Sequence, residues 1–583
     1  MSTDVVMESS IQRAPASAPA RRACWTRPVT YAVVAVAALA LWAVRWRGPI
    51  DLRYDAAVYY VLGTSLAEGH GYRILSEPGA PEGVQYPPLL PAIVALHQKA
   101  LGTSDPAVVG PWLRGTFAVL FVVCAIAALS LARRLLPPGL AVLAVLLTLG
   151  QANTYLYSDL LFTELPFALA SVGFVGVLAV SPATRGREAA AFGLASAAFL
   201  LRSAGIALLA TWVAEALWRR DWRRAGLRAL LAAVPFLAWQ MHIAAVRKSE
   251  DYRHPAYAYQ RANYQFYNVT YAENMSLADP FRPELGAATP AVWAKRVLEN
   301  LAAMPAAVGE CVSESIGFWR ATFLGTGEEN VRQHVWENRW ARMPLYVLFG
   351  FVAVGGAVLF ARREHPMLLL IVSSMALVCT TPWPEQFARY LTPLIPFLAI
   401  AAVLGGQRAW EWLGTQPRRT ALARWAVVGF CGLVVLVQLA AAYFVFRQRH
   451  YEPATFVPGR GLTAPRLFYY GPAWVDWEKA VRWVGREALP GDVVATTSPH
   501  LCYLWTGLPA VMPPMAHDPA EARRLLDTVP VRWVIVDELK FLDISERYAR
   551  PAVEGETKDW RLVKTIGGAR IYRRVEPGQE EAS

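Results

Sequence analysis

The chain has 583 residues, of which 55% are hydrophobic and only 17% charged, and its net charge is +12 at pH 7. The charged residues avoid a series of apolar blocks that are each about 15 to 22 residues long. Because a helix rises about 1.5 Å per residue, roughly 20 apolar residues cross the hydrocarbon core of a bilayer. The composition therefore excludes an ordinary water-soluble domain and indicates an integral membrane protein with many spans.

Eleven apolar blocks are predicted to cross the membrane. The third, fifth and ninth are short enough to be tilted, re-entrant or merged with a neighbour. In chain order, the blocks are residues 29–46, 111–132, 139–153, 160–180, 188–201, 204–218, 226–246, 343–361, 366–381, 389–405 and 424–446.

The orientation of the spans can be tested with the positive charges, because short cytoplasmic loops collect Arg and Lys. If the amino terminus is cytoplasmic, alternate loops should be basic, and they are. The net charge thus mostly reflects topology, and no basic–aromatic groove supports a nucleic-acid partner. The cytoplasmic arginines are Arg13, Arg21, Arg22, Arg27, Arg133, Arg134, Arg185, Arg187, Arg219, Arg220, Arg223, Arg224, Arg362, Arg363, Arg408, Arg418 and Arg419.

This topology predicts three parts for a multi-pass protein of the cell (inner) membrane. Residues 1–28, rich in Ser, Ala, Pro and Arg, form a disordered cytoplasmic tail, and the first span is retained as an anchor. Residues 29–446 form the transmembrane domain, with outer loops at 47–110 and 247–342. Residues 447–583 lie outside the membrane.

The region after residue 447 changes character. Residues 475–488 and 518–528 have helical periodicity, whereas 493–497, 531–536 and 569–575 have the pattern of strands. These elements predict a small extracytoplasmic α/β domain. It lacks a glycine-rich nucleotide fingerprint, a P-loop and a nucleophile elbow, so we interpret it as a docking or acceptor-positioning module.

Several absences narrow the function. The chain has no Asp-x-Asp pair, which metal-dependent enzymes using nucleotide sugars often carry, and no phosphate-binding loop of a pump. The histidines show no HxH or HExxH spacing, so no cofactor is evident and a divalent metal remains open. These absences favour a substrate that carries its own lipid, with membrane lipids around it.

The densest group of polar residues follows the first span. In Asp51-Leu52-Arg53-Tyr54-Asp55-Ala56-Ala57-Val58-Tyr59, a helix starting at Asp55 would place Asp55 and Tyr59 on one face. The helix dipole would keep the Asp55 carboxylate ionised in the first turn, and an ionised carboxylate is a usable general base. The alternative is that Asp55 only caps a helix at the membrane surface.

This region resembles the polyprenyl-phosphate-sugar glycosyltransferases of the C-type fold, which include the protein O-mannosyltransferases and the lipid A aminoarabinose transferases. The resemblance rests on an Asp soon after the first span, a Tyr four residues later, Leu66-Ala67-Glu68-Gly69-His70-Gly71-Tyr72, the turn Pro87-Pro88-Leu89, and Arg114 entering the second span.

The resemblance extends along most of the chain. Tyr157-Ser158-Asp159-Leu160-Leu161-Phe162-Thr163-Glu164 is similar to the second acidic site of the family, Leu201-Arg202-Ser203 to a basic position between the fifth and sixth spans, and Arg389-Tyr390-Leu391-Thr392-Pro393 to a late Arg-Tyr-x-x-Pro motif. With Asp55, these sites all face outward in the predicted topology.

The resemblance implies an inverting transfer of a sugar from a polyprenyl-phosphate-linked donor, a hexosyl or pentosyl group, to an extracytoplasmic glycan, lipid or protein. Asp55 would be the general base, while Glu164 would orient the acceptor or the sugar, with Asp159 as its competitor. The phosphate candidates are Arg114, Arg202 and Arg389, because a guanidinium can bind phosphate through two contacts. Tyr59 and Tyr390 complete the predicted substrate-binding residues.

Each cation has a structural alternative. Arg114 and Arg202 sit where an arginine can extend from the end of a span to the interface, and Arg389 can balance Glu385. The tyrosines of loop 247–342, Tyr267 among them, are suited either to stacking on a sugar or to lying at the membrane interface.

One departure from the family concerns the phosphate. The aminoarabinose transferases carry a Lys directly before the Pro-Pro-Leu turn, where this chain has Gln85-Tyr86. This difference argues against aminoarabinose transfer to lipid A and leaves the donor sugar and acceptor open. Two functions from other classes stay open as well: a transporter or flippase of a lipid or small solute, and a non-catalytic membrane scaffold.

Overall fold

The structure is a computed structural model of the whole chain. It describes residues 27–45, 48–180, 184–319, 342–414, 420–451, 454–457, 461–465, 471–539, 543–555 and 559–575. Nearly all of the predicted cytoplasmic tail, residues 1–26, lies outside these ranges.

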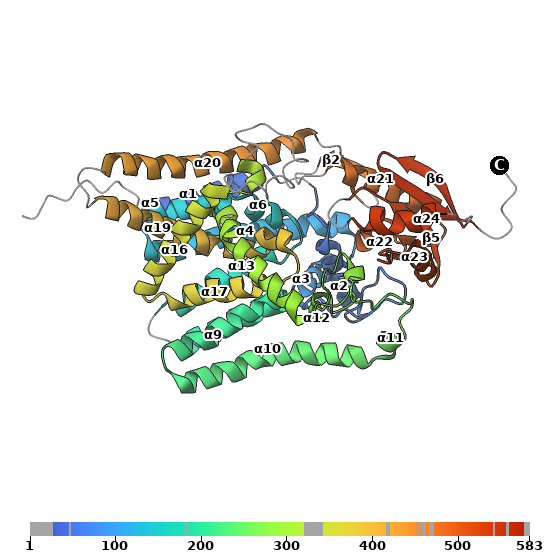
Figure 1. The fold of residues 1–583 in the computed structure, drawn as a ribbon, viewed down its shortest axis with the longest axis horizontal. Coiled ribbons are helices and arrows are strands. Elements are labelled where there is room, and N and C mark those ends of the chain that lie inside the picture. Colours follow the sequence, from blue (N-terminus) through green and yellow to red (C-terminus); the bar gives the residue numbers. More distant parts are fainter. Residues whose placement is uncertain are drawn as a thin grey trace, which may run out of the picture.

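A bundle of long apolar helices makes up most of the molecule, and its helices run side by side toward the C-terminal sheet (Figure 1). Every predicted apolar block overlaps at least one helix of the bundle. The bundle helices are α1 (Arg27–Ala43), α4 (Pro106–Leu135), α5 (Pro138–Gly150), α6 (Ala152–Asp159), α7 (Glu164–Leu178), α8 (Arg185–Leu201), α9 (Ile206–Trp218), α10 (Trp222–Lys248), α16 (Met343–Ala361), α17 (His365–Cys379), α19 (Ile395–Gly414) and α20 (Thr420–Tyr451).

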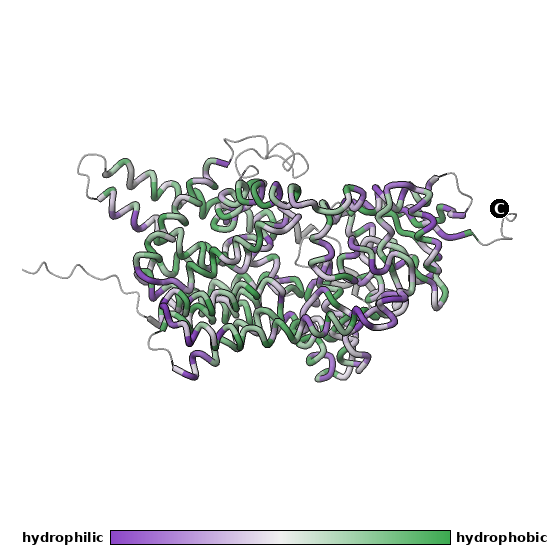
Figure 2. Tube along the Cα trace, turned by 60° about the horizontal axis from the view of Figure 1, so that its bottom comes forward, coloured by the Kyte–Doolittle hydropathy of each residue, from purple (hydrophilic) through white to green (hydrophobic). Residues whose placement is uncertain are grey.

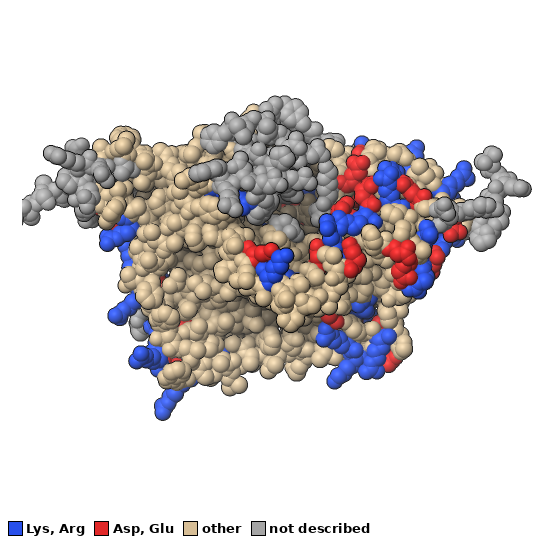
Figure 3. All heavy atoms as spheres, viewed as in Figure 1, with Lys and Arg blue, Asp and Glu red and all other residues tan. Residues whose placement is uncertain are grey.

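Five helices among the described residues are long and apolar enough to cross a membrane, or six if α5 and α6 count as one span bent by 56°. Others, such as α1, α7 and α17, are shorter apolar helices. The chain is therefore a multi-pass helical membrane protein, as predicted, while the number eleven stays a prediction. Figure 2 shows the apolar bundle with hydrophilic segments toward its two ends, and Figure 3 shows a face of the bundle with few charges between a basic edge and a region of mixed charge.

The backbones of α16 and α19 are in close contact. A Cβ added to Gly355 would lie 1.8 Å from the carbonyl oxygen of Ala401, and one added to Gly405 would lie 1.9 Å from that of Phe351. Lipid tails are as apolar as leucine side chains, so helices in a membrane gain little from apolar burial and associate by close packing at small residues. These two glycines therefore determine how closely the helices approach.

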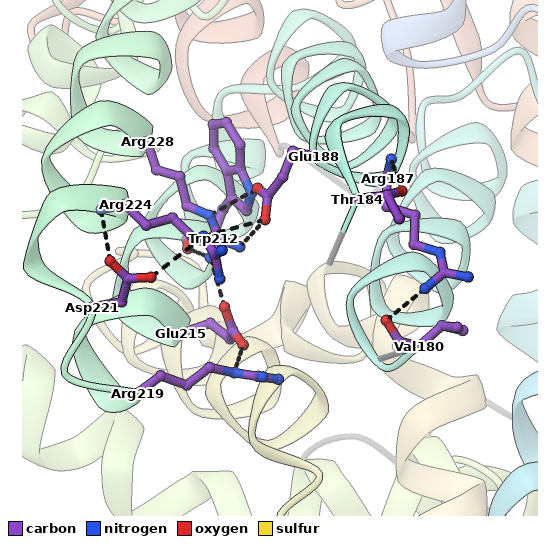
Figure 4. Close-up of polar contacts among 10 residues, drawn as sticks. All are labelled: Val180, Thr184, Arg187, Glu188, Trp212, Glu215, Arg219, Asp221, Arg224 and Arg228. Atoms are coloured by element: carbon purple, nitrogen blue, oxygen red, sulfur yellow. Dashed lines mark hydrogen bonds and ion pairs between the residues drawn. The ribbon is translucent and has the colours of Figure 1, made fainter. Parts of the chain in front are cut away.

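Ion pairs tie α8, α9 and α10 together near the loops that were predicted to be cytoplasmic (Figure 4). The Arg228 guanidinium, buried on α10, bonds Glu188 of α8 at 2.7 Å and Glu215 of α9 at 2.6 Å, and it also donates to the carbonyl of Trp212. Arg219 pairs with Glu215 as well. Arg228, which is not part of the predicted basic cluster, is thus neutralised inside the helix bundle, whereas Arg219 of that cluster is half exposed.

The two outer loops fold together. Glu77 of the first loop is buried and accepts hydrogen bonds from Tyr257 at 2.8 Å and Asn268 at 2.7 Å in the second, and burial raises its pKa. The loops contain α2 (Asp55–Glu68), α3 (Leu89–Leu101), α11 (Glu250–Arg253), α12 (Tyr271–Met275) and α13 (Pro290–Val312), of which only the helix starting at Asp55 was predicted. A short helix, α18 (Phe387–Leu391), precedes α19.

The C-terminal region forms a five-stranded sheet of order β4-β3-β5-β7-β6, with β3 parallel to both β4 and β5, and β7 antiparallel to its neighbours. The three predicted strands correspond to β3 (Val493–Ala495), β5 (Val531–Val536) and β7 (Ala569–Arg574), and the two predicted helices to α21 (Pro472–Glu487) and α23 (Pro519–Leu526). The remaining elements are β4 (Ala510–Val511), β6 (Trp560–Ile566), α22 (Pro499–Thr506), α24 (Arg550–Glu554) and the separate hairpin of β1 (Ala454–Val457) and β2 (Gly461–Pro465).

Candidate functional site

A short parallel pairing of two distant segments positions the two acidic residues. Asp51 forms a bridge with Leu160: its amide donates to the carbonyl of Asp159 at 3.1 Å, and its carbonyl accepts from the amide of Leu161 at 3.0 Å. Asp55 and Glu164 each come four residues after a bridged residue, and each begins a helix, α2 and α7. The parallel register therefore brings two helix N-termini and their carboxylates together.

Arg389 joins the two carboxylates. Its Nη2 lies 2.5 Å from Oδ2 of Asp55, and its Nε lies 2.8 Å from Oε1 of Glu164. The guanidinium also stacks over Phe162, with its central carbon 4.4 Å from the ring centroid. Glu164 is almost fully buried, whereas Asp55 and Arg389 keep 19% and 17% of their side chains exposed. Part of the surface of the Asp55–Arg389 pair is therefore open, whereas Glu164 is enclosed.

Arg202, at the end of α8, contacts the same carboxylate. Its Nη1 lies 3.1 Å from Oε1 of Glu164, and its guanidinium lies over the ring of Tyr390, 5.1 Å from the centroid. Among the described residues, no group bonds Oε2 of Glu164, although this atom is buried. A buried carboxylate oxygen without a partner is costly, which makes it a place where a bound hydroxyl would be favoured.

Tyrosines surround these charges. Tyr59 packs against Tyr86 with ring centroids 4.7 Å apart, and Tyr86 in turn packs against Tyr271 at 6.3 Å. Tyr267 directs its hydroxyl at Oδ1 of Asp55, 3.5 Å away, and burial followed by the nearby Asp55 charge raises its pKa, so the hydroxyl stays protonated. The sequence predicted Tyr59 and Tyr390 as substrate-binding residues. For Tyr267 it left open stacking on a sugar or a place at the membrane interface.

Tyr86 and Tyr271 lie at the site but were not predicted from the sequence to be site residues. Tyr86 directly precedes the Pro-Pro-Leu turn and Tyr271 begins α12 in the aromatic loop, so both lie in segments that the sequence marked as unusual. No spacing rule connects residues 86 and 271, because only the folding of one outer loop on the other places them together.

Arg114 and Asp159 form a second, deeply buried ion pair, with side-chain exposures of 3% and 1%. Arg114 also donates to the carbonyls of Gly48 and Pro49, at 3.1 and 3.3 Å. These bonds connect α4 to the segment after the first span and to the end of α6. The two residues, which the sequence offered as substrate ligands, are therefore bonded to each other beside the group of Asp55, Glu164 and Arg389.

An apolar cavity of about 30 Å³ lies inside the bundle next to Glu164. Its walls come from α4, α5, α6, α7 and α19 and from the residues that precede α19. Besides Glu164 it is lined by Phe121, Cys124, Ala125, Ala128, Thr148, Leu149, Thr154, Tyr157, Ser158, Leu165, Ala168, Thr392 and Pro396.

In the part of the chain that the structure describes, no three His, Cys, Asp or Glu side chains are grouped as a metal site. Asp55 and Glu164 share a guanidinium instead. Gln85, where the aminoarabinose transferases have Lys, is buried and donates from Nε2 to Oδ1 of Asn274 at 3.0 Å. This side chain therefore connects the two outer loops.

The fold is the C-type fold of solved membrane glycosyltransferases. It is similar to ArnT, an aminoarabinose transferase, from Cupriavidus metallidurans, solved bound to undecaprenyl phosphate, with a TM-score of 0.50 and 12% identity over 93% of this chain and 98% of ArnT. It is equally similar to the oligosaccharyltransferase AglB from Archaeoglobus fulgidus, solved with an inhibitory peptide and a dolichol-phosphate, with a TM-score of 0.50 and 14% identity over 88% of this chain and 70% of AglB.

Comparison of the sequence with protein-family models and with curated proteins finds no match. The relationship to these enzymes is therefore one of fold, and the chemistry has to be argued from the residues of this chain.

Proposed function

We propose that this protein is an inverting glycosyltransferase that moves a sugar from a polyprenyl-phosphate-linked donor to an extracytoplasmic acceptor. The observation that carries the proposal is the bridge from Arg389 to both Asp55 and Glu164, a partly exposed charged group at the end of a bundle of apolar helices. A phosphate head group on a lipid chain needs cations of this kind next to apolar helices.

Asp55 is the general base of the proposed reaction. The adjacent Arg389 guanidinium stabilises the negative charge of the carboxylate, and the partial exposure of Asp55 lets an acceptor hydroxyl approach. As the acceptor oxygen attacks the anomeric carbon, Asp55 takes the hydroxyl proton and the bond from that carbon to the phosphate oxygen breaks. A single displacement of this kind inverts the anomeric configuration, and the polyprenyl phosphate leaves with the bonding electrons.

The arginines stabilise the departing phosphate. Among the described residues, Nη1 of Arg389 and Nε and Nη2 of Arg202 make no hydrogen bond, so both guanidiniums keep donors for a phosphate oxygen. Preorganised donors at the position where charge develops are usually the largest contribution to catalysis. Glu164 holds both cations in place, and its buried Oε2 is available to a sugar hydroxyl.

The proposal includes the topology from the sequence: about eleven spans, a cytoplasmic amino terminus, location in the cell membrane, and extracytoplasmic residues 447–583. The outer loops 47–110 and 247–342 carry Asp55 and the tyrosines Tyr59, Tyr86, Tyr267 and Tyr271. The solved neighbours were bound to undecaprenyl phosphate and to a dolichol-phosphate, which supports a lipid-phosphate donor here. Arg114 and Asp159 are then positioning residues, and Tyr59 and Tyr390 line the sugar site.

The test uses purified full-length protein in detergent with undecaprenyl-phosphate-linked mannose, glucose, galactose and arabinose. We expect the wild type to consume at least one donor and Asp55→Asn to lower the rate about 100-fold or more. The matched control is Glu68→Gln, because Glu68 ends the helix that Asp55 begins and is 43% exposed.

An Asp55→Asn variant as active as the wild type would remove Asp55 from the role of base. If none of the donors is consumed, the proteins are reconstituted in vesicles and movement of the labelled lipid across the bilayer is measured. Movement without sugar transfer would favour the flippase alternative.

A further inference from the structure

The C-terminal sheet domain contacts two residues next to Asp55: Tyr54, which precedes it in the chain, and Tyr267, whose hydroxyl faces it. Trp474 of α21 packs edge-on against Tyr54, the residue before Asp55, with ring centroids 5.4 Å apart. His500 of α22 packs edge-on against Tyr267 at 4.7 Å, and the hydroxyl of Tyr267 faces Oδ1 of Asp55. The domain therefore contacts the residue before Asp55 and the tyrosine that faces Asp55.

We propose that His500 is a positioning residue for the transfer reaction, and that the C-terminal domain orients Asp55 through the contact of His500 with Tyr267. The inference rests on the proposed function in assigning Asp55 as the base. The C-terminal domain would then help to position the catalytic base, in addition to the docking or acceptor-positioning role predicted from the sequence.

His500 is held rigidly enough for this role. Its Nδ1 lies 2.7 Å from Oγ of Ser76, and both side chains are buried. The backbone reinforces the contact, because the amide of Ala510 donates to the carbonyl of Ser76 at 2.8 Å. The imidazole is thus fixed at the junction of its own domain and the first outer loop.

The contact between His500 and Tyr267 is a packing contact between two rings and involves no charge. Burial lowers the pKa of His500 to about 3, so the ring is neutral at pH 7 and adds no charge beside Asp55. The imidazole ring of His500 packs against the ring of Tyr267. The ring of Tyr86 also packs against Tyr267, with centroids 6.2 Å apart.

The distance from Tyr267 to Asp55 makes this support important. The hydroxyl lies 3.5 Å from Oδ1, longer than the roughly 2.5–3.0 Å of an ordinary O–H···O hydrogen bond, so a small shift of the ring makes or breaks the bond. Tyr267 lies in the loop that precedes α12, outside helix and strand, so neighbouring side chains determine its position.

A double-mutant cycle tests the coupling with the donor that the wild type consumes. We expect His500→Ala and Tyr267→Phe each to lower kcat about 10- to 100-fold with the KM for the donor within twofold. The double variant should be no slower than the slower single variant, because both changes break one connection. His517→Ala is the control, since His517 is an exposed histidine of the same domain. Losses that multiply in the double variant, or a fully active His500→Ala, would overturn the inference.

A second measurement does not depend on turnover. Hydrogen exchange at residues 54–57 and 265–271 should rise in His500→Ala and stay unchanged in His517→Ala. If no donor is consumed but exchange rises as expected, the proposed function fails while the coupling stands. If exchange is unchanged, the coupling is wrong whether or not the protein transfers sugar.

Discussion

Arg389 lies 2.5 Å from Asp55, a residue 334 positions earlier in the chain, and the pair sits where α2 meets the short helix before α19. Each side chain neutralises the other while both keep part of their surface open. A charge pair of this kind can bind an anion with its cation and accept a proton with its carboxylate.

The planar guanidinium of Arg389 is needed to bridge two carboxylates. Arg389→Lys keeps the charge, but a single ammonium cannot present two nitrogens in the same fork. We expect donor consumption to fall about 100-fold or more, while Arg408→Lys, an exposed change in α19, has no effect. An Arg389→Lys rate within twofold of the wild type would show that the bridge is not part of the chemistry.

The Arg114–Asp159 pair should contribute mainly to stability. Arg114→Met or Asp159→Asn leaves one buried charge without its partner, which costs about 3–5 kcal/mol. We expect thermal unfolding in detergent at clearly lower temperature for each variant, and partial recovery when both residues become Leu. Unchanged unfolding together with lost activity would instead support the ligand role that the sequence suggested.

The contact between α16 and α19 should not tolerate a methyl group. Gly355→Ala places a Cβ 1.8 Å from a backbone oxygen, so the helices must separate, and we expect a strongly lowered melting temperature or no folded protein. Gly350→Ala on the same helix meets no atom within 4 Å and should be neutral or slightly stabilising. Equal melting temperatures for the two variants would contradict this packing.

The C-terminal domain should become more stable relative to an Asp537→Asn variant as the pH falls. Burial raises the pKa of Asp537 to about 6, although it accepts hydrogen bonds from Thr497 and the amide of Leu539. The folded state thus binds the Asp537 proton more tightly than the unfolded state, where the pKa is about 3.9. The cost of ionisation is absent below about pH 4 and complete above about pH 7.

Replacing Asp537 by Asn removes that cost, and the hydroxyl of Thr497 can accept from the new amide. We expect the variant to be about 2–3 kcal/mol more stable at pH 7 and equal to the wild type near pH 4. Hydrogen exchange of the β5 amides measures the difference. His500, whose pKa is lowered in the folded state, also makes stability depend on pH. Both proteins contain His500, so its contribution cancels in the difference between their stabilities. A difference that is the same at pH 4 and pH 7 would contradict the pKa shift.

The sequence by itself determined the membrane class and the positions of the apolar helices, because apolar run length and arginine placement are local properties of the chain. It also selected Asp55, Glu164, Arg202 and Arg389, which the structure joins in one network. Tertiary structure alone decided that Asp51 pairs with Leu160, that Arg114 and Asp159 are bonded to each other, and that Tyr86, Tyr271 and His500 lie around the site. These contacts join residues tens to hundreds of positions apart, and they depend on how the helices pack and the outer loops fold together, which no local pattern encodes.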